Sequence, residues 1–292
     1  MKTLCIYHGP GCTDGFAAAW AVRSAFGVSN VDFRYAAYGS EPPYDIASGR
    51  DVLIVDFSYP RTALDALAGR SRSVTVLDHH KTAQADLVGL PISTRWISIE
   101  KLSALFDMDR SGAGITWDFL LGRVSPRPQL IDYVEDYDLW RFALPHSRAI
   151  NAAIKSYPDE FEAFDALASE IDDEEGFRTL RTEGEAILRA RAKDVEDAVR
   201  ATVRWIRIGG VSVPVANVPG SMASDAGHLM ATRYGNAPFV ATYHDSDGWR
   251  RVSLRSVEGG ADVSEIAKRY RGGGHAHASG FSAPAGWEGD AP

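Results

Sequence analysis

Residues 4–20, LCIYHGPGCTDGFAAAW, join a short apolar run to an alanine-rich stretch through a glycine-containing loop. Two further apolar runs, residues 52–55 and 74–77, also end in polar residues. Apolar runs that alternate with helical patterns are typical of a parallel α/β sheet, whose strands end at one common edge. Three polar residues directly follow the three runs and are expected at that edge: His8, Asp56 and Asp78.

Helical patterns follow or lie between the strand-like runs. Residues 15–26 have helical spacing, and Asp14 before them belongs to a residue type that caps helix N-termini. We therefore expect Asp14 to be the N-cap, with its carboxylate in the loop. Further helices are predicted to start near Ser111 and to span about residues 128–137. The latter region carries four acidic residues: Asp132, Glu135, Asp136 and Asp138.

The second half of the chain predicts a connector and another domain. An amphipathic pattern over residues 173–202 predicts one long helix. Beyond it, strand-like runs and helical stretches alternate again. The fold class is therefore α/β, with an N-terminal parallel-sheet domain, a helical connector, a smaller C-terminal α/β domain and a short tail. Their predicted bounds are 1–150, 151–204, 205–283 and 284–292.

The composition limits the classes of function. With 292 residues, 45% of them hydrophobic, the chain can bury a sizeable core. A net charge of -8 argues against a protein that coats nucleic acid, so an anionic substrate needs bound cations or a local positive patch. Cys5 and Cys12 are too few for a disulfide framework. No uncharged apolar run approaches the roughly 18 residues of a membrane helix. We expect a cytoplasmic protein without a membrane partner.

Several short motifs in the first half become informative when they occur together. Alone, each has an ordinary explanation as a helix cap, a turn or a surface histidine pair. The motifs are His8-x3-Cys12-x-Asp14, the lone Asp56, and Asp78-His79-His80. In this order they resemble the DHH phosphoesterase superfamily, in a branch that includes nanoRNases, RecJ-like nucleases and exopolyphosphatase-related proteins.

The second half carries the most specific part of this resemblance. Residues 252–256, 262–270 and 272–281 (VSLRS, DVSEIAKRY and GGGHAHASGF) are similar to the substrate-binding domain associated with DHH proteins. Consecutive glycines let backbone amides approach a phosphate, and arginine or histidine can donate charge-assisted hydrogen bonds to it. The expected substrate-binding residues are Arg255, Ser256, Gly273, Gly274 and His275.

The resemblance implies a centre of one or two divalent metals, usually Mn²⁺. Asp56 would bridge two ions, and Asp138 competes with Asp136 for one ligand position. His80 would approach the substrate phosphate or the bridging water, or would only orient His79, and Asp78 is the second expected catalytic residue. The metal-ligand positions are His8, Cys12, Asp14, Asp56, His79 and Asp136.

Cys12 departs from the family pattern, which has an aspartate at this position. Three interpretations are open. A thiolate could bind the metal directly and favour a softer ion such as zinc, iron or cobalt. Alternatively, the first metal site is weakened and one ion is held tightly. In the third interpretation Cys12 and His8 only pack.

The leading hypothesis is a metal-dependent phosphoesterase that hydrolyses terminal phosphodiester bonds of short oligonucleotides, as a nanoRNase-like exonuclease does. One alternative is a phosphomonoesterase for phosphoadenosine phosphate or an exopolyphosphatase. Another is a catalytically impaired nucleotide-binding sensor. Aromatic residues that stack on bases would favour a nucleotide substrate, and the candidates are Tyr59, Trp140 and Tyr243. A homodimer is also left open.

Overall fold

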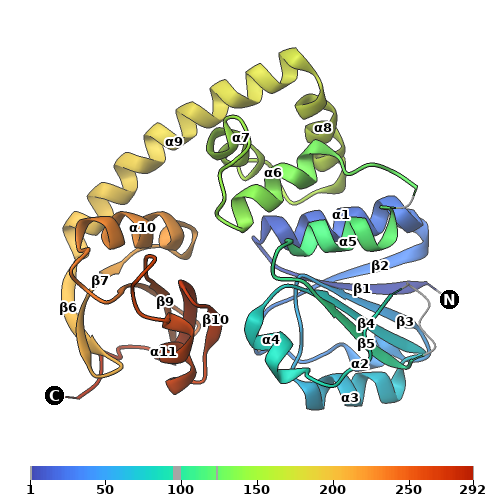
Figure 1. Ribbon diagram of the computed structural model, residues 1–292, viewed down its shortest axis with the longest axis horizontal. Coiled ribbons are helices and arrows are strands. Elements are labelled where there is room, and N and C mark those ends of the chain that lie inside the picture. The colour runs from blue at the N-terminus through green and yellow to red at the C-terminus, as the bar shows by residue number, and fades with distance from the viewer. Residues whose placement is uncertain (1, 95–99, 123, 292) are drawn as a thin grey trace. The chain divides into compact units, whose positions relative to one another are not determined.

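The computed structural model describes residues 2–94, 100–122 and 124–291 (Figure 1). The chain divides into two compact units, Met1–Leu188 and Arg189–Pro292, here called the N-terminal and C-terminal units. Both units are α/β, as the sequence predicts. None of the helices in the described residues combines the length and the apolar character needed to cross a membrane.

The N-terminal unit contains a five-stranded parallel sheet with the strand order β2-β1-β3-β4-β5. The three strands predicted from the apolar runs are its central strands, and this prediction is confirmed. The strands are β1 (Thr3–His8), β2 (Val31–Ala36), β3 (Asp51–Val55), β4 (Ser73–Asp78) and β5 (Leu102–Phe106).

Helices cover both faces of this sheet (Figure 1). The side chains of the central strand β3 alternate between the two faces of the sheet, so they contribute to two hydrophobic cores. Leu53 and Val55 join the core that includes α1 and α5, and Val52 and Ile54 join the core that includes α3. The helices are α1 (Thr13–Phe26), α2 (Tyr44–Ala47), α3 (Arg61–Arg70), α4 (Lys81–Asp86), α5 (Gly112–Leu120), α6 (Gln129–Asp138), α7 (Ser147–Ile154) and α8 (Phe161–Asp172), with the 3-10 turn η1 (Val28–Asn30).

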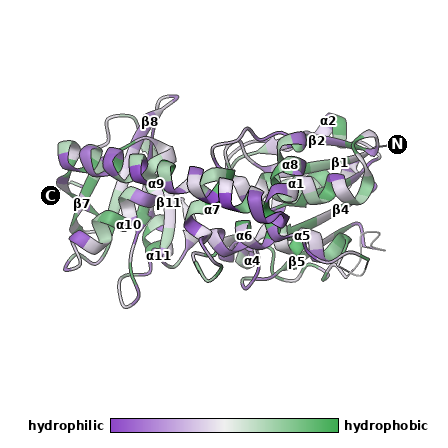
Figure 2. Ribbon diagram, turned by 90° about the horizontal axis from the view of Figure 1, so that it is seen from above, coloured by the Kyte–Doolittle hydropathy of each residue, from purple (hydrophilic) through white to green (hydrophobic). Residues whose placement is uncertain are grey.

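The long helix predicted over residues 173–202 is α9 (Glu174–Thr202). The boundary between the two units falls inside it. Leu180 belongs to a core of the N-terminal unit, whereas Val195 and Val199 belong to a core of the C-terminal unit. Figure 2 shows that α9 is largely hydrophilic, in contrast to the apolar α1. Each half of α9 therefore contributes its few apolar side chains to one unit.

The C-terminal unit is built on a six-stranded sheet with the order β10-β11-β9-β8-β7-β6. Only β7 and β8 pair in parallel, and the other pairs are antiparallel. Residues beyond the last strand also pack, since the Trp287 ring lies 5.5 Å from that of Phe281. The elements are β6 (Arg204–Ile208), β7 (Val211–Asn217), η2 (Gly220–Met222), α10 (Ala223–Arg233), β8 (Val240–Ser246), β9 (Trp249–Arg255), α11 (Val263–Arg269), β10 (Gly273–His275) and β11 (Ala278–Pro284).

Candidate metal centre

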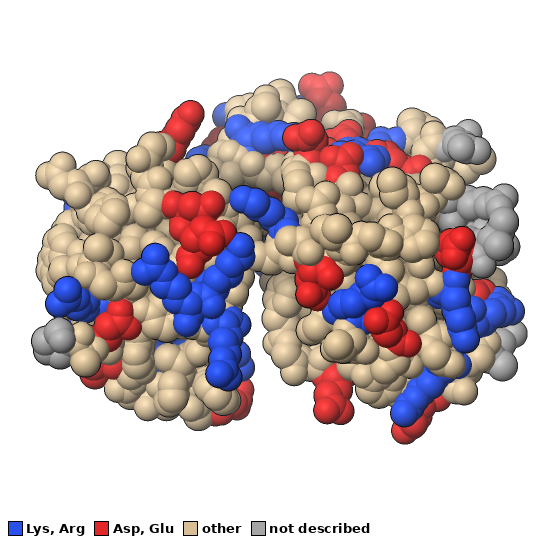
Figure 3. Space-filling model, turned by 60° about the horizontal axis from the view of Figure 1, so that its bottom comes forward, with Lys and Arg blue, Asp and Glu red and all other residues tan. Residues whose placement is uncertain are grey.

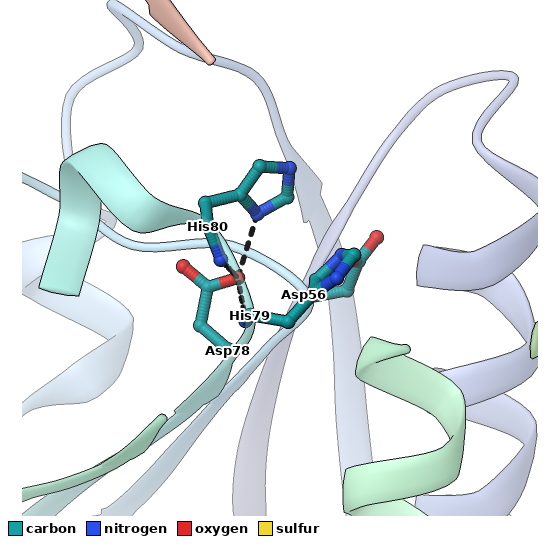
Figure 4. Close-up of side chains that lie close together, drawn as sticks. All are labelled: Asp56, Asp78, His79 and His80. Atoms are coloured by element: carbon teal, nitrogen blue, oxygen red, sulfur yellow. Dashed lines mark hydrogen bonds and ion pairs between the residues drawn. The ribbon is translucent and has the colours of Figure 1, made fainter. Parts of the chain in front are cut away.

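The ends of three parallel strands bring histidines and aspartates together at one edge of the N-terminal sheet. His8 ends β1, Asp56 follows β3, and Asp78 ends β4. The Nε2 atom of His79 lies 3.2 Å from Oδ1 of Asp56 (Figure 4). Ligand-type atoms of Asp56, Asp78, His79 and His80 all lie within 4.8 Å of one another. The clustering expected from the strand ends is present.

Asp56 stands between two groups of side chains. Its Oδ2 lies 3.5 Å from His8 Nδ1 and 3.4 Å from Cys12 Sγ, which donates to it. Its other oxygen, Oδ1, faces His79. The residue has φ 55, a backbone conformation uncommon outside glycine and often found at functional sites. A carboxylate placed in this way directs one oxygen to each group.

The two groups differ in their chemistry. The first, here called the sulfur set, consists of His8, Cys12 and Asp56, whose ligand-type atoms lie within 4.8 Å of one another. The second, here called the carboxylate set, consists of Asp14, His79 and Asp138 with the same closeness. In the carboxylate set, His79 Nε2 lies 3.5 Å from Asp138 Oδ2 and 3.9 Å from Asp14 Oδ2.

Asp14 has a different position from the one predicted. The N-cap of α1 is Cys12, because the helix begins at Thr13 and the Gly15 amide donates to Cys12 Sγ at 3.4 Å. The prediction that Asp14 is the cap was wrong. Asp14 lies in the first helical turn, buried, and accepts hydrogen bonds from the Gly112 and Ala113 amides at 2.7 and 3.0 Å. The N-terminus of α5 thus holds its carboxylate in place.

The structure brings Asp138, and not Asp136, to the carboxylate set. The two residues are separated by two positions on α6, and side chains with this spacing point in different directions. Asp138 faces His79. The carboxylate of Asp136 instead accepts hydrogen bonds from the amides of Ala143 and Leu144, at 2.8 and 3.4 Å. The sequence named both residues and favoured Asp136, but the Asp136 side chain leaves α6 in a different direction from that of Asp138 and contacts the following loop.

Asp78 contacts both histidines that follow it in the chain. It is fully buried, and its Oδ1 accepts a hydrogen bond from the His79 amide at 2.7 Å. The same oxygen lies 2.7 Å from His80 Nδ1 (Figure 4). A buried carboxylate in this position fixes the orientation of the imidazole ring. Burial lowers the pKa of His80, but the charge and hydrogen bond of Asp78 outweigh it and raise the pKa.

The carboxylates and histidines of the centre perturb one another strongly. Burial raises the pKa of Asp56, but the close approach of the His79 and His8 rings outweighs it and holds the pKa well below the usual range. Burial, followed by the charges of Asp56 and Asp138, raises the pKa of Asp14 well above the usual range. This concentration of negative charge, within a group of imidazole and carboxylate donors, is what divalent cations relieve.

Some buried donor atoms of the centre lack hydrogen-bond partners in the described part of the chain, as expected of metal ligands. Within the described part of the chain, the buried atoms His8 Nδ1 and Asp56 Oδ1 have no hydrogen-bond partner. Such atoms are costly unless something else binds them. Imidazole nitrogen and carboxylate oxygen suit divalent ions such as Mn²⁺, and Cys12 adds a soft donor to one side. The residues of both sets therefore fit divalent metal ions.

The predicted substrate-binding residues lie in the C-terminal unit. Arg255 ends β9 and donates to the Leu254 carbonyl at 2.9 Å and to Ser224 Oγ at 3.0 Å. Ser256 Oγ lies 2.9 Å from Nδ1 of His277, a residue to which the sequence assigned no role. Figure 3 shows Lys and Arg side chains gathered on one face of this unit.

The glycines of this region form a strand pair. Gly273 and Gly274 belong to β10 together with His275, and β10 pairs with β11. Gly274 has φ +136, and a Cβ there would lie 2.6 Å from the Ala278 carbonyl oxygen. Glycine is therefore required at this position by the fold alone, whether or not the amides also contact a phosphate.

Comparison with known proteins identifies the family. Residues 211–290 match the family model of the DHHA1 domain, which includes the glycine strand pair and Arg255. The chain belongs to the DHH phosphoesterase superfamily. The resemblance inferred from the motifs is confirmed.

Two known proteins are similar to this chain in sequence. It is 29% identical over 228 residues to "Oligoribonuclease NrnB" of Bacillus subtilis (strain 168), covering 72% of this chain and 52% of the relative. It is 25% identical over 295 residues to "Uncharacterized protein R106" of Acanthamoeba polyphaga mimivirus, covering 95% of this chain and 66% of the relative. The chain thus spans about half of one relative and about two thirds of the other.

A solved structure supports the fold of this DHH protein. It is described as "Member of s1p family of ribosomal proteins", DHH domain, and superposes with a TM-score of 0.51. The match covers 96% of this chain and 82% of that chain at 14% identity. At this identity the likeness concerns the fold alone.

Proposed function

We propose that this DHH protein is a divalent-metal-dependent phosphoesterase that hydrolyses terminal phosphodiester bonds of short oligonucleotides. The observation that carries the proposal is the position of Asp56, which directs one oxygen to the sulfur set and the other to the carboxylate set. When bound, two cations supply Lewis-acid stabilisation of the phosphate and a hydroxide near neutral pH. The residues that would hold them are His8, Cys12, Asp14, Asp56, His79 and Asp138.

His80 and Asp78 have a separate part in the proposed reaction. Asp78 binds Nδ1 of His80 and stabilises the protonated ring. The second ring nitrogen, Nε2, is then able to donate a proton or a charge-assisted hydrogen bond to a phosphate oxygen. Asp78 positions this group and does not itself contact the substrate.

We propose that Cys12 binds a metal through its thiolate. The sulfur is 3.4 Å from Asp56 Oδ2 and belongs to the same cluster as His8. Partial burial and the charges of Asp56 and Asp14 raise the pKa of the thiol. A cation in the sulfur set would offset this effect and favour the thiolate. Sulfur prefers softer ions such as zinc, iron or cobalt, whereas the carboxylate set suits Mn²⁺.

The proposed substrate class has two supports. The first is the NrnB relative, an oligoribonuclease by name, although this chain spans only half of its length. The second is the DHHA1 region, in which we propose that the phosphate is bound by Arg255, Ser256, Gly273, Gly274 and His275.

The test is a substrate panel with the purified protein and Mn²⁺. It compares a dinucleotide, a five-nucleotide RNA, phosphoadenosine phosphate and polyphosphate. The proposal expects the fastest turnover with the dinucleotide or the RNA. Asp56→Ala should lose this activity, while the matched surface variant Asp65→Ala, on α3, should keep it.

Other results would replace the proposal. Preferred turnover of phosphoadenosine phosphate or polyphosphate would make the protein a phosphomonoesterase or an exopolyphosphatase. Tight binding of a nucleotide without turnover of any substrate would make it a sensor. Full activity of Asp56→Ala would contradict the bridging role of this aspartate.

A further inference from the structure

We propose that the loop after α6, residues 139–146, binds a nucleobase of the substrate by stacking it on Trp140. The loop, here called the aromatic loop, lies in the N-terminal unit and directly follows Asp138 of the carboxylate set. This inference rests on the proposed function, because it concerns the substrate of the same centre. It assigns the base to a site outside the DHHA1 region.

In the aromatic loop, the Trp140 ring packs against two other aromatic rings. The Trp140 ring lies 4.7 Å from that of Phe142 and 5.6 Å from that of Tyr137, in edge-to-face arrangements. Trp140 is nevertheless 38% exposed. Edge-to-face packing fixes the orientation of an aromatic ring. An exposed, rigidly held indole of this kind is a stacking surface for a base.

Cations flank the same rings. The Arg148 guanidinium carbon lies 3.5 Å from the centre of the Phe142 ring and 5.4 Å from that of Trp140. Lys155 Nζ lies 3.4 Å from the centre of the Tyr137 ring. Both cations are on exposed residues of a chain with a net charge of -8. Their positive charge offsets the repulsion between the carboxylates of the centre and the phosphodiester of a nucleotide.

The backbone of the aromatic loop is held in a strained form. Trp140 and Phe142 have φ 57 and φ 51, in the left-handed region that bulky side chains rarely adopt. Such strain persists only where the surroundings enforce it, and it is frequent at ligand sites. Asp136 enforces it here, because its carbonyl accepts from the Arg141 amide at 2.9 Å and its carboxylate accepts from the Ala143 amide at 2.8 Å. Asp136 is thus a positioning residue of the loop.

The position of Trp140 along the chain ties it to the centre. It follows Asp138 by two residues, and two residues span at most about 7 Å. Asp138 Oδ2 is itself 3.5 Å from His79 Nε2. A base stacked on Trp140 would therefore carry its own phosphodiester close to the donor sets.

The other two aromatic candidates from the sequence do not offer such a surface. Tyr59 is 3% exposed and belongs to a core of the sheet. The Tyr243 ring is covered by the guanidinium of Arg250, whose carbon is 4.1 Å from the ring centre. Trp140 is the most exposed of the three residues.

The test compares a dinucleotide with the same compound lacking both bases, in steady-state kinetics with Mn²⁺. Trp140→Ala should raise KM for the dinucleotide about 5- to 100-fold, the range typical of one lost base stack. KM for the abasic compound should not change, and kcat should stay within about threefold in both cases. Trp140→Phe should restore much of the loss. Trp249→Ala, which removes a tryptophan that is 47% exposed in the C-terminal unit, is the matched control and should behave as wild type.

A binding measurement separates this inference from the proposed function. If the wild type does not hydrolyse the dinucleotide, the proposed function fails while the stacking site is still tested by titrating AMP and ribose 5-phosphate. AMP should quench tryptophan fluorescence in the wild type and not in Trp140→Phe, and ribose 5-phosphate should quench neither. Equal KM changes for the two dinucleotide compounds, or AMP quenching that survives in Trp140→Phe, would overturn the stacking site.

Discussion

The two halves of the candidate metal centre, on either side of Asp56, differ in donor type and in which of their side chains is exposed. In the sulfur set, the His8 side chain is 24% exposed and Cys12 is half-buried. In the carboxylate set, the side chains of His79 and Asp14 are only 4% and 1% exposed, whereas that of Asp138 is 31% exposed. Two amides of α5 hold the Asp14 carboxylate. A shared carboxylate thus joins two sites of unequal donor chemistry, one rich in oxygen donors and the other containing a soft sulfur donor.

The largest effect on both halves is expected from Gly112→Ala. A Cβ on Gly112 would lie 2.3 Å from Cβ of Asp56, so the bridging residue has to move. We expect turnover to fall more than about 100-fold, beyond the usual loss on removal of a supporting contact, and stability to fall by about 1–3 kcal/mol. Activity assays and thermal unfolding measure the two effects.

Gly69→Ala is the control for this substitution. Gly69 lies in α3, and a Cβ there has open space around it. The variant should be stabilised by about 0.4–1 kcal/mol with unchanged turnover. Equal behaviour of the two variants would contradict the close approach of α5 to Asp56.

The next effect should be confined to the carboxylate set. Asp138→Asn removes a charge that faces His79. Mn²⁺ affinity, measured by calorimetry, should fall more than about 100-fold, since loss of a ligand exceeds the 10- to 100-fold cost of losing an outer partner. Asp136→Asn, two residues away, keeps an oxygen for the Ala143 amide and should bind Mn²⁺ within about tenfold of wild type. The reverse order would return Asp136 to the ligand position.

Asp78→Asn should have a smaller effect that spares the metals. The variant weakens the contact with His80 Nδ1, which then loses its fixed orientation and its raised pKa. We expect kcat to fall about 10- to 100-fold, as for other partners that orient a catalytic histidine. Metal content, measured by elemental analysis, should remain that of wild type. Loss of metal in this variant would mean that Asp78 supports the ligands themselves.

The smallest effect is a pH dependence of the carboxylate set. Burial lowers the pKa of His79, but the close contact with Asp56 and the charges of Asp138, Asp56 and Asp14 outweigh it and raise the pKa to about 10. A metal must displace this proton, so Mn²⁺ affinity should rise about tenfold per pH unit between roughly pH 7 and 9. Without metal, the raised pKa stabilises the fold below the ordinary value of 6.5, and this stabilisation is lost as the pH rises through about 10. Calorimetric titrations at several pH values measure the slope, and a flat profile would contradict it.

The sequence predicts the strands that are buried on both faces of the sheet, but it does not predict the half-exposed edge strand. The central strands β1, β3 and β4 are continuous apolar runs and were predicted. The edge strand β2, VDFRYA, carries charged residues on its exposed side and gives no apolar run. Its pairing with β1 depends on tertiary contacts, which the local hydrophobic pattern of the sequence does not predict.

The candidate site divides in a similar way. Residues at strand ends, such as His8 and Asp56, could be predicted because the parallel sheet alone gathers them. The helical phase that selects Asp138 depends on the rotation of α6, which the acidic cluster does not fix. Gly112 could not be found at all, since it acts through its amide on Asp14, 98 residues away.

A cobalt titration can show whether Asp56 joins two metal sites of which only one contains sulfur. Co²⁺ bound by a thiolate absorbs in the near ultraviolet, which reports the sulfur set separately from total binding. We predict two Co²⁺ per chain, with an absorption band that is lost in Cys12→Ser and kept in Cys5→Ser, because Cys5 is fully buried in the core. A single bound ion, or a band that survives in Cys12→Ser, would contradict the account.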